Sequence, residues 1–146
     1  MKKDTVVILV FTDGKRVLVE KRELEQYKTS QYLIPGGTVK ELETLKQALA
    51  REAMEELGVK VLDYTELPSQ KEIRGLKGQF LKPFLIRKWE GGIAKIILDK
   101  GNPLSWVEFD EALSSQVLPT RKVVEALKRY INRDSSLIAQ NDGGKV

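Results

Sequence analysis

The feature that most constrains this chain is a spaced array of glycines and carboxylates between residues 37 and 59. It reads Gly37, five residues, Glu43, seven residues, and then the run Arg-Glu-Ala-Met-Glu-Glu-Leu-Gly-Val from Arg51 to Val59. Three carboxylates of that run are spaced at i, i+3 and i+4, namely Glu52, Glu55 and Glu56. On one helix they share an arc roughly 100° wide.

Three like charges on one helix face repel one another, each pair by roughly 0.2–0.5 kcal/mol. A stable helix with this pattern therefore needs positive charge in front of it, and a divalent cation supplies that charge. All-oxygen ligation suits Mg²⁺ or Mn²⁺, which keep several waters and accept phosphate oxygens as further ligands. The pattern predicts attack on a phosphate chain.

The flanking residues define the ends of that helix. Thr44 stands three residues before Gln47, which is the spacing of a capping box, and Gly58 suits a left-handed helix end. Ahead of the helix, Ile34–Thr38 is typical of a strand end and turn. Its two glycines, Gly36 and Gly37, allow the backbone to approach a ligand closely.

The stretch from Gly37 to Val59 resembles the signature of the Nudix hydrolases, G-x5-E-x7-R-E-U-x-E-E-x-G-U, in which U is an apolar residue. Every fixed position matches. The resemblance implies an α/β fold, the Nudix α/β/α sandwich, with a mixed β-sheet between helices and a loop-helix-loop catalytic motif. Less specific similarity to the MutT-type branch, which removes oxidised nucleoside triphosphates, covers most of residues 5–131.

The resemblance also implies roles for the matching residues. The metal ligands would be Glu52, Glu55 and Glu56, joined by the backbone carbonyl of Gly37. Glu55 or Glu56 could also position the attacking water. We expect Arg51 to pair with Glu43 and hold the loop against the helix, in preference to contacting substrate.

Candidate substrate-binding residues lie mostly outside the signature. Arg22 at a strand end could contact phosphate, although a solvated surface charge is nearly as good an interpretation. Tyr27 and Tyr32 flank the turn before Gly36, where a ring could stack on a nucleobase, while packing in the core is the more frequent role of a strand aromatic. The backbone at Gly36 and Gly37 completes this set.

Two departures from the MutT-type branch affect the substrate assignment. Arg87 stands where that branch places a further acidic metal ligand, for which Glu90 could substitute. Pro119 is followed by Thr120, whereas the branch has an Asn that reads the oxidised purine. Thr120 has a single hydroxyl, whereas the Asn side chain has an amide with separate donor and acceptor groups. This difference weakens the assignment of oxidised guanine as the substrate base.

Composition excludes several other classes of protein. The 146 residues contain no His and no Cys, which rules out His-based triads, His-ligated zinc and thiol nucleophiles. The net charge of +4 is dispersed, so we expect a small nucleotide as partner and no nucleic acid. No apolar run approaches 18 residues and no signal peptide is recognisable, so we expect no membrane contact and a cytoplasmic location. The oligomeric state stays open.

Periodicity predicts one domain over residues 1–131 and a flexible tail over 132–146. Thr5–Phe11 and Arg16–Lys21 are predicted to form a hairpin around a turn at residues 12–15. The further strands and helices that we expect are Val59–Leu67, Lys71–Arg74, Phe80–Lys88, Leu104–Phe109, a short helix at Asp110–Ser114, and a last helix from Pro119 to Ile131.

The function that we predict is divalent-metal-dependent hydrolysis of a nucleoside diphosphate linked to a group X. Our first choice is a housecleaning nucleoside triphosphate pyrophosphohydrolase that releases a nucleoside monophosphate and pyrophosphate. Hydrolysis of dinucleoside polyphosphates or nucleotide sugars is the alternative within the family. A non-catalytic nucleotide-binding module is the alternative from another class, although this chain keeps every catalytic Glu of the signature.

Overall fold

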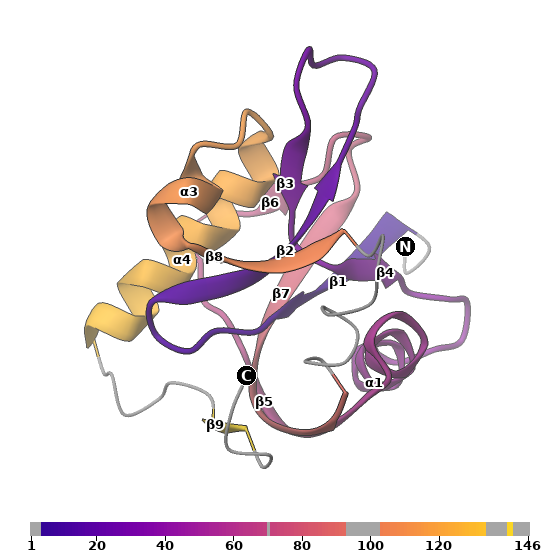
Figure 1. Cartoon of the computed structure of the whole chain (residues 1–146). Helices are drawn as coiled ribbons and strands as arrows, with labels where there is room; N and C mark the ends of the chain where they lie inside the picture. The colour runs from indigo at the N-terminus through magenta and orange to yellow at the C-terminus, as the bar shows by residue number, and fades with distance from the viewer. Residues whose placement is uncertain (1–3, 70, 93–102, 134–139, 142–146) are drawn as a thin grey trace.

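The computed structural model describes residues 4–69, 71–92, 103–133 and 140–141, and its elements are labelled in Figure 1. The strands are β1 (Thr5–Val10), β2 (Arg16–Arg22), β3 (Gln31–Leu33), β4 (Gly36–Thr38), β5 (Val59–Glu66), β6 (Ile73–Arg74), β7 (Phe80–Gly91), β8 (Leu104–Glu108) and β9 (Gln140–Asn141). The helices are α1 (Leu45–Leu57), α3 (Phe109–Leu113) and α4 (Leu118–Arg133). None of these helices is long and apolar enough to cross a membrane.

The strands form two sheets between helices, which confirms the α/β architecture with a mixed sheet. In the larger sheet the order is β4-β1-β7-β5, with β6 and β9 also paired to β7. Strand β1 runs parallel to β7 and antiparallel to β4, so this sheet is mixed. The smaller sheet is antiparallel, in the order β3-β2-β8. In Figure 1, α1 lies on one side of the sheets and α3 and α4 lie on the other.

Strand β1 supplies both halves of the core because its side chains alternate between its two faces. Val7 and Leu9 belong to the apolar cluster that contains the buried face of α1. Ile8 and Val10 belong to the opposite cluster, which contains the buried face of α4. This central strand is covered on both faces, and a continuous apolar run is the sequence expected for such a strand.

The predicted hairpin is wrong beyond its turn. The turn forms as expected, with a single bridge between Thr12 and Val17, but β1 and β2 then separate into different sheets. Both edges of β1 are already taken by β4 and β7. Strand β2 pairs instead with β3 and β8, and this pairing places Arg22 beside the strand that precedes Gly36.

Other boundaries differ by a few residues. Strand β7 continues to Gly91, α4 starts at Leu118 and ends at Arg133, and the short helix α3 starts at Phe109. The predicted tail over 132–146 falls mostly outside the described residues. Within it, 132–133 belong to α4 and Gln140–Asn141 pair with β7.

Candidate active site

Helix α1 carries the carboxylates, and both of its ends are fixed as the sequence predicts. The Thr44 hydroxyl accepts a hydrogen bond from the Gln47 backbone N–H at 3.0 Å, and the Gln47 side chain accepts one from the Thr44 N–H at 2.8 Å. At the other end Gly58 adopts a φ of 64°, and its N–H donates to the Met54 carbonyl. These caps hold the helix in one register, so the carboxylates have defined positions.

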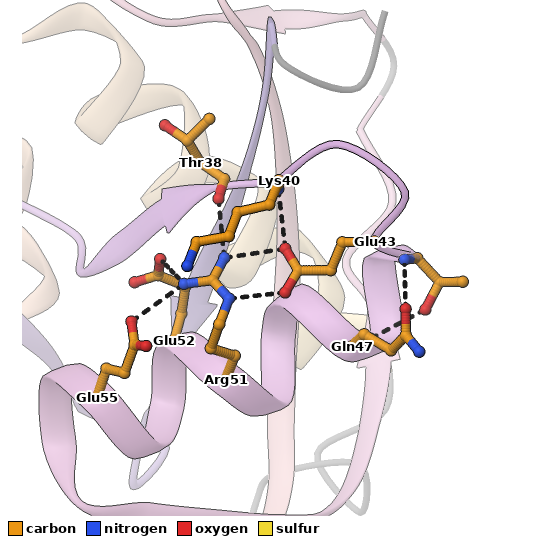
Figure 2. Close-up of polar contacts among 8 residues, drawn as sticks. Thr38, Lys40, Glu43, Gln47, Arg51, Glu52 and Glu55 are labelled. Carbon is orange, nitrogen blue, oxygen red and sulfur yellow. Dashed lines mark hydrogen bonds and ion pairs between the residues drawn. The ribbon is translucent and has the colours of Figure 1, made fainter.

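Arg51 is the centre of the site (Figure 2). Its Nε and Nη2 donate to the two carboxylate oxygens of Glu43 at 2.6 and 2.9 Å. Its Nη1 donates to Glu52 at 2.8 Å and to Glu55 at 3.0 Å, and Nη2 also donates to the Thr38 carbonyl at 3.0 Å. The predicted pairing with Glu43 is confirmed. One guanidinium thus ties the Thr38–Glu43 loop to two of the three carboxylates on α1.

These hydrogen bonds shift the pKa of the Glu43 carboxylate. Hydrogen bonding from Arg51, together with the Lys40 backbone N–H at 2.8 Å, lowers the pKa of Glu43 from 4.5 to about 2. A lowered folded-state pKa adds stability above the unfolded value, and that stability is lost as the pH falls toward the folded value. We therefore expect the melting temperature of wild type to fall between pH 4.5 and about 2 more steeply than that of Glu43→Gln. An equal dependence of melting temperature on pH in the two proteins across that window would contradict the lowered pKa of Glu43.

The glycine pair in β4 leaves room for two different neighbours. A Cβ atom on Gly36 would lie 2.3 Å from the backbone oxygen of Val7, on the paired strand β1. A Cβ atom on Gly37 would lie 2.0 Å from the carboxyl carbon of Glu52. The Gly37 backbone is therefore in direct contact with a carboxylate of α1, as the predicted shared role of Gly37 and Glu52 requires.

These neighbours predict different defects for two alanine variants. Gly37→Ala displaces the Glu52 side chain, so we expect metal affinity to fall about tenfold to a hundredfold while the fold persists. Gly36→Ala pushes against backbone, so we expect it to lower the melting temperature more. Calorimetric Mg²⁺ titration and thermal melts of both variants measure the two effects. Equal metal affinity in wild type and Gly37→Ala would argue against a ligand role for this part of the site.

Glu56 is the third carboxylate, and negative charge surrounds it. Burial raises the pKa of Glu56, and the nearby charges of Glu52, Glu20 and Glu55 raise it further, while Arg22 lowers it. Two of these groups, Glu20 and Arg22, come from β2. The helix carboxylates therefore face β2 as well as the Gly37 backbone.

A cleft of about 410 Å³ begins at this point and extends between the β2–β3 hairpin, the β6–β7 turn and the start of α4. Its polar and glycine lining residues are Glu20, Arg22, Gly36, Gly37, Thr38, Gly75, Lys77, Gln79 and Thr120. Its apolar lining residues are Val6, Ile8, Leu24, Leu33, Ile34, Leu76, Leu81, Val117, Pro119 and Val123. None of the three α1 carboxylates lines the cleft itself, but Gly37, which does, contacts Glu52. A largely apolar cleft that adjoins a carboxylate in this way suits a nucleotide.

Four of the predicted substrate-binding residues line this cleft, namely Arg22, Gly36, Gly37 and Thr120. Tyr32 does not, and its hydroxyl donates a hydrogen bond to Glu111 on α3 instead. Tyr27 is also absent from the lining. Thr120 is 3% exposed and its hydroxyl donates to the Tyr32 carbonyl at 2.8 Å, so its donor is already used.

Sequence reasoning missed Glu20, Leu24, Lys77 and Gln79. Glu20 had a usable signal, because it stands two residues before Arg22 and so shares its face of the strand. No such signal exists for Lys77 and Gln79, because the long-range pairing of β7 with β1 brings the β6–β7 turn to the cleft.

Arg87, at the position where the MutT-type branch has a further acidic ligand, and Glu90, its proposed substitute, both lie on β7 outside the cleft lining. Arg87 forms an ion pair with Asp63 of β5 at 3.7 Å. Glu90 is exposed and pairs in register with Lys60, and it does not line the cleft. Among the described residues, no three acidic side chains are already arranged to hold a metal ion. Arg51 occupies oxygens of both Glu52 and Glu55.

Comparison with known proteins gives a consistent assignment. The sequence model of the NUDIX domain family matches residues 1–127. The 8-oxo-dGTP diphosphatase of Buchnera aphidicola subsp. Schizaphis graminum (strain Sg) is 30% identical over 112 residues, which are 76% of this chain and 82% of that protein.

Solved structures share the fold at lower identity. The E. coli ORF135 protein superposes with a TM-score of 0.65 at 24% identity, covering 90% of this chain and 91% of its own. The MutT Nudix hydrolase of Burkholderia pseudomallei gives 0.63 at 22% identity, with 84% and 96% covered. NrtR of Shewanella oneidensis gives 0.64 at 15% identity, with 93% and 70% covered. With its signature helix, its mixed sheet between helices and a family match over most of its length, this chain belongs to the Nudix family of hydrolases.

Proposed function

We propose that this chain is a divalent-metal-dependent nucleoside triphosphate pyrophosphohydrolase of the housecleaning type, which releases a nucleoside monophosphate and pyrophosphate. The observation that carries the proposal is the position of the carboxylates. Arg51 holds Glu52 and Glu55, and Glu52 adjoins a largely apolar cleft at Gly37. The cleft lining includes the cations Arg22 and Lys77, which suit a phosphate chain.

The residues present fit Mg²⁺ or Mn²⁺. The donors are all oxygens, from Glu52, Glu55, Glu56 and the Gly37 carbonyl, as these hard ions prefer. Glu56 lies near the charges of Glu52 and Glu55, and this concentration of negative charge favours a bound cation. Arg51 contacts one oxygen of Glu52 and one of Glu55 and leaves the second oxygen of each available. A metal ion held there would neutralise charge on the phosphate oxygens.

The side chains around the cleft would have separate roles in binding and hydrolysis. Arg22 would bind phosphate oxygens, and the cleft interior would hold the base and sugar against apolar side chains. Arg51 would keep Glu52 and Glu55 at fixed positions throughout turnover. Glu55 or Glu56 would orient the water that attacks phosphorus, with its carboxylate accepting a proton from that water.

The relative from Buchnera makes 8-oxo-dGTP the first substrate to examine. Thr120 departs from the MutT-type Asn, so a preference for the oxidised base would have to arise elsewhere in the cleft.

A substrate panel tests the proposal. Purified protein is incubated with Mg²⁺ or Mn²⁺ and, in turn, with 8-oxo-dGTP, the normal nucleoside triphosphates, a dinucleoside polyphosphate and a nucleotide sugar. We expect the highest kcat/KM for a nucleoside triphosphate. A higher kcat/KM for the dinucleoside polyphosphate or the nucleotide sugar would replace the proposed substrate class. If the protein binds one of these compounds but hydrolyses none of them, a non-catalytic nucleotide-binding module would be favoured.

A further inference from the structure

The cleft has two walls that belong to different parts of the fold. One wall includes Leu33 and Ile34, which end β3 and follow it. The facing wall includes Val117, Pro119 and Thr120, at the start of α4. No backbone hydrogen bond joins Gln31–Leu33 to residues 111–120 within the described chain. The separation of the walls therefore depends on side chains.

A buried amide makes the first set of connections. Gln31 is 3% exposed, and its Nε2 donates to Gln116 Oε1 at 3.0 Å. Its Oε1 accepts from the Gln116 backbone N–H at 2.6 Å and from the Ser115 hydroxyl at 3.3 Å. Gln31 thus bonds to the loop before α4 through both ends of its amide.

The Tyr32 carbonyl makes the second set. It accepts from the Thr120 hydroxyl at 2.8 Å and from the Ser115 hydroxyl at 3.0 Å, whose single proton is shared with Gln31 Oε1. Because Thr120 and Ser115 are each 3% exposed, water does not readily replace either donor when it is lost. We call the side chains of Gln31, Ser115, Gln116 and Thr120 the wall clamp.

We propose that the wall clamp sets the width of the substrate cleft, and that Thr120 is a positioning residue that acts through the wall and does not read the base. This inference rests on the proposed function. The clamp holds β3 and α4, whereas Glu52 and Glu55 on α1 are held by Arg51, and Glu52 adjoins Gly37. Loosening the clamp therefore weakens substrate binding and leaves the chemical step intact.

The chain offers a matched control for this test. Thr12 is also a buried threonine, 1% exposed, whose hydroxyl donates to a backbone carbonyl, that of Arg16 at 2.6 Å. It lies in the β1–β2 turn and does not line the cleft. Thr120→Val and Thr12→Val both delete one buried hydroxyl at nearly constant volume. Thr120→Ser keeps the hydroxyl.

The experiment measures steady-state kinetics with the best nucleoside triphosphate, and amide hydrogen exchange of the free proteins. For Thr120→Val we expect KM to rise roughly fivefold to tenfold with kcat within about twofold of wild type. Exchange should become faster in segments 31–34 and 117–123. Thr120→Ser should restore KM, and Thr12→Val should leave KM unchanged. If Thr120→Val does not fold, Ser115→Ala removes the other donor to the Tyr32 carbonyl and takes its place.

Three results would overturn the inference: an unchanged KM in Thr120→Val, an equal rise of KM in Thr12→Val, or a failure of Thr120→Ser to restore KM. The last two would indicate general destabilisation or a steric effect. A wild-type protein that hydrolyses no nucleotide would instead refute the proposed function and, with it, a positioning role. Hydrogen exchange would then still show whether the clamp holds the two walls, because that measurement needs no substrate.

Discussion

Glu56→Gln is expected to lower kcat by about a thousandfold or more at saturating Mg²⁺, and Glu55→Gln to do the same. Each change is nearly isosteric and removes one negative charge from the predicted metal ligands. The measurement is initial-rate kinetics with the best nucleoside triphosphate over a range of Mg²⁺ concentrations. Wild-type turnover in both variants would show that these carboxylates do not form the catalytic site.

Stability should change in the opposite direction from activity for Glu56→Gln. The folded-state pKa of Glu56 is raised by desolvation and by neighbouring carboxylates, so the ionised form of this side chain destabilises the fold. Glutamine removes that penalty. The metal-free variant should therefore melt at the same temperature as wild type or slightly higher, which excludes misfolding as the cause of its inactivity.

Arg51→Lys is the second large effect that we expect. Lysine keeps the charge, but its single ammonium cannot reproduce the contacts of the guanidinium with Glu43, Glu52, Glu55 and the Thr38 carbonyl. Metal affinity and kcat/KM should each fall about tenfold to a hundredfold, because the supporting contacts of the ligands are lost. Calorimetric metal titration and kinetics measure the two quantities.

Arg16→Lys is the matched control. Arg16 also binds one carboxylate through two nitrogens, with Nε and Nη2 at 2.9 and 2.8 Å from Oδ2 of Asp13. That pair is on the surface at the β1–β2 turn, and neither residue lines the cleft. We expect wild-type activity from Arg16→Lys. If both lysine variants lose activity to the same extent, the loss does not reflect the position of Arg51.

Helix α1 was predictable because its sequence signals are local. The capping box at Thr44, the left-handed Gly58 and the Arg51–Glu43 pair all lie within 15 residues of one another. Spacing on a helix then determines which side chains share a face. The structure reproduces each of these features.

The cleft was less predictable because tertiary pairing builds it. Strand β2 belongs to a different sheet from β1. The turn residues 12–15 do not predict that separation, because they determine only the local chain reversal. Tyr32 was expected near the substrate because it lies close to Gly36 in the sequence. Its hydroxyl instead bonds to Glu111, which is 79 residues away in the sequence. Lys77 lies in the β6–β7 turn, and it reaches the cleft because β7 pairs with β1, where Phe80 is in register with Thr5.

Product analysis tests the central claim most directly. Wild-type protein and Glu56→Gln are incubated with 8-oxo-dGTP and with the best normal nucleoside triphosphate, with Mg²⁺ or with excess EDTA, and the products are separated by ion-exchange chromatography. We predict equimolar nucleoside monophosphate and pyrophosphate from wild type with Mg²⁺, no product with EDTA, and about a thousandfold less of both products from Glu56→Gln in the same time. Turnover at the wild-type rate in EDTA or in Glu56→Gln, or products that are nucleoside diphosphate and phosphate, would contradict the account.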